Sequence, residues 1–176
     1  MSCVEIVGFT KNKCFIIGEV NNAWKGAMAI WKILEKKYLP PYQPSWWNPN
    51  LNKEPPSRCL QPESAREIWD LSKSEKLSQN EKIVLNSTFD RCIVNVDSID
   101  KVIFAFREFE GVTNLKEQAD LIEQTIKKDS KIIAIGWNQT SVCENQWMTA
   151  NFDEKTEEYI SYNLEKDTNH WFLPTE

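Results

Sequence analysis

The alternation of apolar and polar residues over 131–174 is the feature that most constrains the fold of this chain. An apolar run at 132–135 opens this stretch, and alternating segments follow at 147–152 and 159–164. A last short apolar segment lies at 170–173. Apolar residues at every second position, interrupted by polar clusters, are typical of antiparallel strands joined by short loops. We therefore expect residues 131–174 to form a C-terminal β-meander.

The start of the chain predicts a β-hairpin. Two short runs, 4–9 and 14–20, are rich in β-branched and aromatic residues, and they flank the polar segment 10–13. Such runs on either side of a short polar segment indicate two antiparallel strands. This hairpin can add two strands to the C-terminal sheet.

A helix is expected next, with its N-cap at Asn21 or Asn22 and its end near Tyr38. Apolar side chains recur at helical spacing and predict one buried stripe, made of Trp24, Ala27, Met28, Trp31, Leu34 and Tyr38. Three lysines lie away from the stripe and predict a basic outer face, namely Lys25, Lys32 and Lys36. Pro40 and Pro41 end the helix, because proline lacks the amide proton and disfavours helical geometry in its predecessor.

The middle of the chain predicts further helices, which begin at Pro62, Ser78, Ser98 and Asn114. Ser78 and Glu81 have the spacing of a capping box, in which the side chain of each residue accepts a hydrogen bond from the backbone amide of the other. The sequence does not decide whether residues 98–110 form a helix or a strand, because their apolar residues fit both helical spacing and strand alternation.

Strand signals at both ends with helices between them predict an α+β fold in a single domain, residues 1–176. We expect an antiparallel sheet, built from the C-terminal meander and the N-terminal hairpin, packed against the helical middle section. A parallel sheet of βαβ units would need strands and helices in alternation, and the chain does not show that order.

A proline- and tryptophan-rich segment spans residues 40–62 and holds seven of the eight prolines. Proline stiffens a chain and aromatic side chains favour contact with a surface, so we expect an ordered strap packed over the core. The alternative is that Trp46 and Trp47 are exposed anchors for a partner, because so long a loop is unusual in a compact domain.

The composition, 41% apolar and 27% charged with eight tryptophans, is that of an ordered globular protein. No apolar run approaches the roughly 20 residues of a membrane span, and no secretory signal pattern opens the chain, so we expect a cytoplasmic protein. The five cysteines are scattered without CxxC spacing, which predicts reduced thiols rather than a metal site.

The negative charge of the chain is concentrated at its C-terminal end. From Glu144 to Glu176 there are eight acids and two bases, a net charge of −6, while the whole chain carries −5. This balance argues against a nucleic-acid binder, which needs a basic surface, and suits a basic protein partner. We expect the contact surface to include four acids near a hairpin turn, Asp153, Glu154, Glu157 and Glu158.

Few residues suit catalysis, so we expect a protein without enzymatic activity, cofactor or metal. His170 is the single histidine, and no HExxH pattern or glycine-rich phosphate loop is present. Cys143 would act as a nucleophile only if the fold placed His170 beside it. The acids at 153–158 resemble a solvated or partner-facing turn more than a catalytic carboxylate pair.

Several segments together resemble the immunity proteins of bacterial contact-dependent growth inhibition systems. The resemblance lies in 22–27 with Ile30-Trp31 and Tyr38-Leu39, in 139–147 and in 152–154, and in size and acidity. It implies a cytosolic toxin inhibitor that binds one cognate toxin domain, often a basic nuclease, and blocks its active site. The resemblance provides no motif that assigns individual residues.

Two other functions remain open from the sequence. One is a small-ligand-binding module or enzyme whose pocket is walled by Trp24, Trp31 and Trp137, although these side chains can equally fill the core. The other is a phage- or plasmid-type protein that modulates its host by binding a host protein. A deep pocket with converging polar groups would favour the first, and an acidic face would favour a binding protein.

Overall fold

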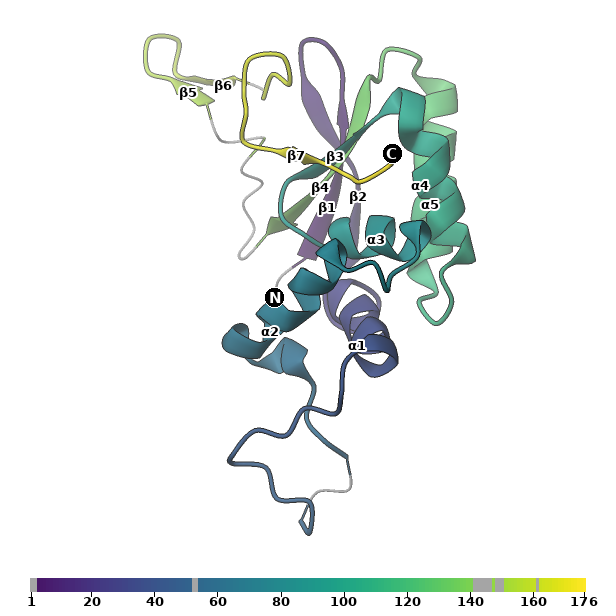
Figure 1. Ribbon diagram of the computed structural model, residues 1–176. Coiled ribbons are helices and arrows are strands. Elements are labelled where there is room, and N and C mark those ends of the chain that lie inside the picture. The colour runs from purple at the N-terminus through teal and green to yellow at the C-terminus, as the bar shows by residue number, and fades with distance from the viewer. Residues whose placement is uncertain (1–2, 52–53, 141–146, 148–150, 161) are drawn as a thin grey trace.

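The computed structural model describes residues 3–51, 54–140, 147, 151–160 and 162–176 (Figure 1). These residues form an α+β fold with an N-terminal hairpin and a helical middle, which confirms the predicted fold class. The main sheet has the strand order β2-β1-β4-β3-β7, and β5 and β6 form a second, two-stranded sheet. The strands are β1 (Cys3–Phe9), β2 (Cys14–Asn21), β3 (Cys92–Asn95), β4 (Ala134–Thr140), β5 (Asn151–Asp153), β6 (Glu158–Ile160) and β7 (Trp171–Phe172).

The centre of the main sheet joins the two ends of the chain. The hairpin β1–β2 is antiparallel, with a register shift between Ile6 and Val7. Strand β4 runs antiparallel along the other side of β1, from Cys3 opposite Thr140 to Phe9 opposite Ala134. The expected addition of the N-terminal hairpin to a C-terminal strand is therefore confirmed.

The rest of the C-terminal region differs from the expected meander. Strand β3, which the sequence analysis did not predict, pairs antiparallel with β4 and occupies the place where the next strand of a meander would lie. Strand β7 pairs with β3 in parallel, and β5–β6 forms a sheet of its own. Residues 148–150 of the alternating segment 147–152 lie outside the described residues.

Within the described ranges, five α-helices follow the predicted starts closely, with one exception. They are α1 (Ala27–Tyr38), α2 (Pro62–Asp70), α3 (Gln79–Asn86), α4 (Ile99–Glu108) and α5 (Asn114–Lys128). The capping box of α3 is present, with both the Ser78 and the Glu81 side chains accepting hydrogen bonds from the partner's backbone amide. Residues 99–108 are helical, with Val102 and Phe106 buried and Phe104 exposed.

The exception is the start of α1, which lies several residues later than predicted. The helix begins at Ala27 after Gly26, and the Asn21 side chain accepts a bond from the Ala23 amide instead of capping the helix. A Cβ at Gly26 would lie 2.0 Å from the Asn21 carbonyl oxygen, so only glycine permits this tight connection. Trp24 therefore precedes the helix and is 77% exposed, so its predicted place in the buried stripe is wrong.

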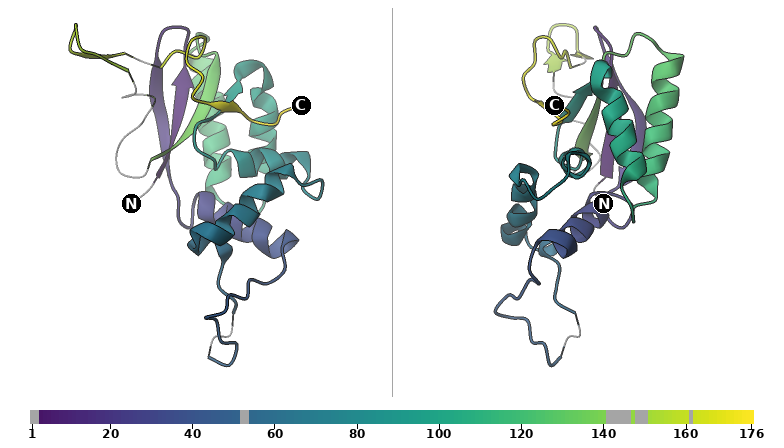
Figure 2. Two further views of the ribbon diagram at one scale, coloured as in Figure 1. Left: turned by 60° about the vertical axis from the view of Figure 1, so that its left-hand side comes forward. Right: turned by 45° about the vertical axis from the view of Figure 1, so that its right-hand side comes forward.

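The sheet carries apolar clusters on its two faces. Helices α4 and α5 lie along one face (Figure 2), where the larger cluster includes Phe106 and Trp137. On the opposite face, Phe9 and Trp147 pack edge to face with ring centroids 5.0 Å apart. A Cβ at Gly136 would lie 2.7 Å from the Trp147 ring, so the glycine leaves the space that this indole fills.

The proline-rich segment projects away from the body of the protein, beyond α1 and α2 (Figures 1 and 2). Its described residues are mostly exposed, including Trp46 at 61% and Leu51 at 80%. The expected packing over the core is therefore not observed for the described residues of 41–57, whereas Arg58 is buried and Cys59 packs against the core. We call residues 41–57 the projecting loop.

Candidate functional site

The four acids predicted to bind a partner lie together on the hairpin β5–β6. Asp153 is opposite Glu158 in the register, and the turn between them holds Glu154 and Glu157. Glu157 has φ 54°, a left-handed conformation that a non-glycine residue adopts mainly in turns. The Asp153 carboxylate accepts the Lys155 amide at 2.9 Å, which fixes the turn. We call residues 153–158 the acidic turn.

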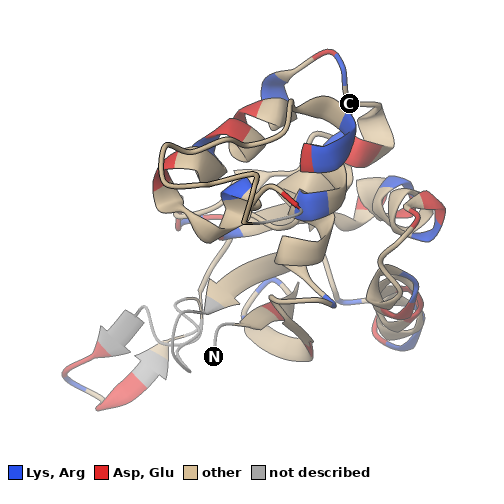
Figure 3. Ribbon diagram, turned by 90° about the horizontal axis from the view of Figure 1, so that it is seen from below, with Lys and Arg blue, Asp and Glu red and all other residues tan. Residues whose placement is uncertain are grey.

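The acidic turn has a surplus of negative charge. It carries four carboxylates and one lysine, a net charge of −3 (Figure 3). Glu154, Glu157 and Glu158 are exposed, and no ion pair between described residues involves any of the four acids. Exposed charges of one sign attract an oppositely charged partner and accelerate its association.

The projecting loop, which holds the two predicted tryptophan anchors, lies at the other end of the molecule from the hairpin β5–β6 (Figure 1). Trp46 is exposed, whereas Trp47 is half-buried and its ring nitrogen is buried without a hydrogen-bond partner among the described groups. Two turns order this part of the loop. The Trp47 amide donates to the Pro44 carbonyl oxygen, and the Leu51 amide donates to the Asn48 carbonyl oxygen. The structure thus separates the predicted partner-binding residues into two surfaces.

A buried arginine that the sequence analysis did not identify holds the projecting loop at its base. Arg58 is 4% exposed, and its guanidinium donates to the Pro40 carbonyl at 2.8 Å, to Glu35 at 3.2 Å and to Glu67 at 2.9 Å. The guanidinium also lies 5.1 Å from the centre of the Tyr42 ring. One side chain therefore ties the two ends of the loop to α1 and α2.

Hydrogen bonds to Glu35 complete this base. The Glu35 carboxylate accepts the Arg58 amide at 2.9 Å and the Ser57 hydroxyl at 2.6 Å. A buried charge pair is stable only when further hydrogen bonds satisfy both groups, and these bonds supply that condition. Neither residue stands out in the sequence, because lone Arg and Glu residues are common and their pairing depends on the fold.

The three tryptophans proposed as pocket walls lie in separate environments and do not line a common pocket. Trp24 is exposed, with the Lys32 ammonium 4.2 Å from the centre of its ring. Trp31 donates to Thr88 at 2.7 Å and packs near Trp69. Trp137 is 1% exposed and fills the core beneath α4 and α5. This arrangement removes the structural basis of a pocket walled by these tryptophans.

His170 belongs to an aromatic cluster on the side of the sheet that faces away from α4 and α5. Its Nδ1 and the Tyr162 hydroxyl share a hydrogen bond of 2.8 Å, and its ring lies against Phe172. Burial lowers the pKa of His170, so the neutral imidazole is favoured. Cys143, its suggested partner, lies outside the described residues.

Cys92 is the most perturbed thiol that the structure describes. Burial raises its pKa to about 12, and the Trp171 ring nitrogen donates to its sulfur. Its thiolate is therefore strongly disfavoured at neutral pH, and a thiol in this state is a poor nucleophile. Among the described residues, no group of three or more His, Cys, Asp or Glu side chains is arranged to hold a metal ion.

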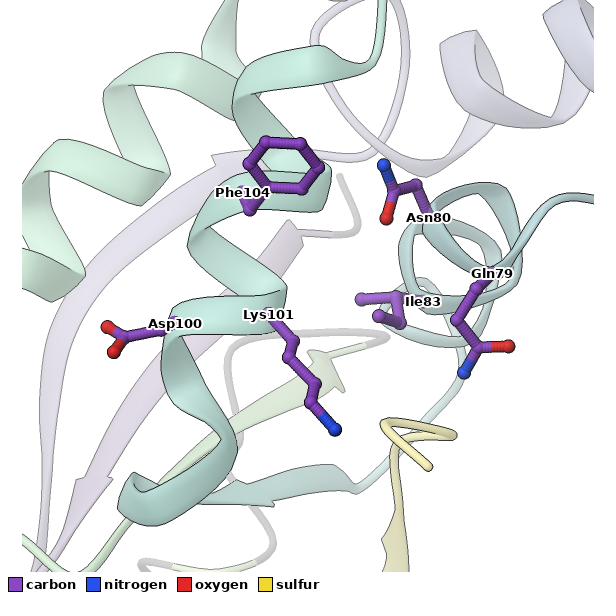
Figure 4. A pocket seen from close by; sticks show the side chains of 6 residues that line it. All are labelled: Gln79, Asn80, Ile83, Asp100, Lys101 and Phe104. Carbon is purple, nitrogen blue, oxygen red and sulfur yellow. The ribbon is translucent and has the colours of Figure 1, made fainter.

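A small pocket of about 310 Å³ lies between α3 and α4 (Figure 4). Ile83 and the exposed ring of Phe104 line it. Gln79 and Lys101, on its other side, bond the end of the chain through the Glu176 and Thr175 carbonyl oxygens. These bonds engage Gln79 and Lys101, so Asn80 and Asp100 are the polar lining side chains left without a hydrogen bond or ion pair among the described residues.

A larger groove of about 670 Å³ lies where the ends of α1 and α4 meet the start of α3. The Glu81 carboxylate lines this groove and accepts hydrogen bonds from the Lys37 ammonium and the Tyr38 hydroxyl, at 2.7 Å each. Burial alone would raise the pKa of Glu81, but its hydrogen bonds with Lys37, Tyr38 and Ser78 outweigh burial and lower the pKa to about 2. This groove could not be recognised in the sequence, because its lining residues come from three separate segments.

No helix in the described part of the chain is long and apolar enough to cross a membrane. Comparisons with protein-family models, with curated proteins and with solved structures found no match to this chain.

Proposed function

We propose that this protein is a non-enzymatic immunity protein that neutralises a bacterial toxin domain in the cytoplasm by binding it. The toxin domain would be basic, as nuclease domains often are, and the acidic turn would contact it. The observation that carries the proposal is the set of exposed carboxylates at Glu154, Glu157 and Glu158, which have no ion-pair partner among the described residues.

The charge and position of the acidic turn support this role. A two-stranded hairpin that extends away from the main sheet (Figures 1 and 2) can reach a concave active site. Its net charge of −3 is opposite in sign to the positive charge of a nucleic-acid-binding cleft. Inhibition of this kind requires only that the protein cover the active site. It therefore needs no catalytic group on the inhibitor.

The experiment that tests the proposal is co-expression of this chain with the product of the gene immediately upstream. We expect the upstream product alone to stop growth, and the two together to permit growth and to co-purify. A harmless upstream product, or one that remains toxic and does not bind this chain, would contradict the immunity function.

A charge-reversed variant, Glu154→Lys/Glu157→Lys/Glu158→Lys, tests the contact surface within the same experiment. We expect it to fold normally and to lose protection. A control variant reverses three exposed acids outside the acidic turn, Glu54, Asp70 and Asp97, and changes the net charge by the same amount. If both variants lost protection equally, total charge rather than the acidic turn would be responsible.

A further inference from the structure

The groove between α1, α3 and α4 combines an apolar floor with a charged rim. Its floor is formed by Ile33, Leu77 and Phe109, of which Leu77 is 4% and Phe109 8% exposed. The volume of about 670 Å³ exceeds that of the pocket between α3 and α4, and it can receive more than one side chain. Because Leu77 and Phe109 are buried, the half-buried Ile33 offers most of the floor's accessible apolar surface to an occupant.

The rim has an excess of negative charge. Glu75, Glu108 and Glu110 are exposed and join no ion pair between described residues, and Lys76 is the rim's unpaired positive charge. Lys37, also on the rim, is already neutralised by Glu81 at 2.7 Å. The rim thus carries a net charge of about −2, counting three free carboxylates and one free ammonium.

Two helix C-termini and one N-terminus, that of α3 at Ser78, border the groove, so the backbone adds a smaller negative potential. Helix α4 ends at Glu108 and α1 ends at Tyr38, and both residues line the groove. The C-terminal end of a helix carries a partial negative charge, because its last carbonyl groups lack partners within the helix. An anionic ligand is therefore disfavoured, and a cationic one is favoured.

We propose that this groove binds a short segment of a partner protein that is both basic and apolar, with arginine as the preferred cation. The aliphatic stems and apolar side chains of such a segment would lie on Ile33, Leu77 and Phe109. A guanidinium would then reach the carboxylates of Glu108 and Glu110, since arginine pairs with carboxylates through two parallel hydrogen bonds. This proposal does not depend on the role of the acidic turn.

The test measures binding of a dye-labelled synthetic peptide with alternating leucine and arginine, acetylated and amidated at its ends, by fluorescence anisotropy. Two matched peptides replace leucine by glycine or arginine by glutamate. We expect the leucine–arginine peptide to bind most tightly, more weakly with added salt, and to shift the amide NMR signals of Leu77, Phe109 and Glu110. Shifts confined to the acidic turn would overturn the proposal.

Two variants with opposite expected effects sharpen the test. Glu108→Gln/Glu110→Gln removes rim charge and is expected to weaken binding about three- to tenfold, as exposed ion pairs do. Lys76→Gln removes the opposing charge and is expected to tighten binding about two- to fivefold. The control, Glu54→Gln/Glu63→Gln, changes exposed acids outside the groove and should leave affinity unchanged.

Other results would overturn the proposal in distinguishable ways. If the glycine–arginine peptide or spermine bound as tightly as the leucine–arginine peptide, the rim would be a simple cation site and the apolar floor would have no role. If the control variant weakened binding as much as the Glu108→Gln/Glu110→Gln variant, the attraction would come from the total charge of the protein. Thermal unfolding of each variant separates these outcomes from loss of the fold.

Discussion

At the scale of single residues, the packing on the sheet depends on close contacts that leave no room for a larger side chain. Gly136 lies under the Trp147 ring in the cluster that covers the sheet on the face away from α4 and α5. A Cβ there would lie 2.7 Å from Trp147 and 2.9 Å from Phe9, inside the distance at which carbon atoms repel each other. The packing of this face therefore requires glycine at 136.

Gly136→Ala should destabilise the protein by about 1–3 kcal/mol, the usual cost of overpacking a core. The measurement is urea unfolding followed by tryptophan fluorescence. Gly8→Ala is the matched control, because its Cβ would meet the end of the Phe15 side chain at 3.0 Å, and that ring can move. Equal losses in the two variants would contradict the packing described for Trp147.

The titration of His170 predicts how stability depends on pH. Burial lowers its pKa below the ordinary 6.5, so the unfolded chain binds a proton more readily than the folded protein. The stability associated with neutral His170 is therefore complete above pH 6.5, and it is lost as the pH falls below that value. Thermal unfolding between pH 7.5 and 5.5 should show this loss, and His170→Gln should reduce it. An unchanged pH dependence in the variant would contradict the assignment to His170.

At the scale of elements, features that depend on neighbouring residues were predicted correctly more often than pairings between distant segments. The hairpin β1–β2, the capping box of α3 and the proline that starts α2 depend on neighbouring residues, and each was recognisable in the sequence. The start of α1 was misplaced, because asparagine favours turns as well as N-caps, and here it forms a turn. Gly26 is the signal that marks the true start.

Strand order could not be read from the sequence, since pairing depends on distant segments. Strand β3 is a four-residue run, CIVN, too short to be distinguished from part of a helix by its pattern alone. Its position between β4 and β7 makes the last pairing parallel and ends the meander. The groove was likewise missed, because the residues that line it come from α1, α3 and α4 and from their connections.

The base of the projecting loop provides a prediction at the same scale. Arg58→Met would leave the buried Glu35 without its charge partner and should cost about 3–5 kcal/mol, as broken buried ion pairs do. Adding Glu35→Gln should restore part of that stability, because it removes the uncompensated charge. Chemical unfolding of the two variants is the measurement.

Amide hydrogen exchange shows which part of the Arg58→Met variant unfolds locally. Amides at the base, such as those of Arg58 and Leu39, should exchange faster in the variant, whereas those of the main sheet should exchange at rates that follow global stability. A variant as stable as the natural protein would contradict the structural role of Arg58.

At the scale of the whole molecule, the predicted partner-binding residues lie on two separate surfaces. The acidic turn and the projecting loop are at opposite ends (Figure 1), and the groove is formed by the helices. The sequence placed Asp153, Glu154, Glu157 and Glu158 on one turn correctly, because they are neighbours in the chain. It had no means of showing that Trp46 and Trp47 lie far from them, which is a property of the complete fold. Because the acidic turn and the projecting loop lie at opposite ends, we expect the acidic turn and Trp46 to contribute independently to binding.

The most direct test of the central claim is the affinity of this chain for the upstream toxin domain, measured by calorimetry at several salt concentrations. We expect affinity to fall steadily with salt and Glu154→Lys/Glu157→Lys/Glu158→Lys to weaken it at least tenfold, while the control reversal at Glu54, Asp70 and Asp97 has a small effect. Affinity that is independent of salt and unchanged by reversal of the acidic turn would contradict the account.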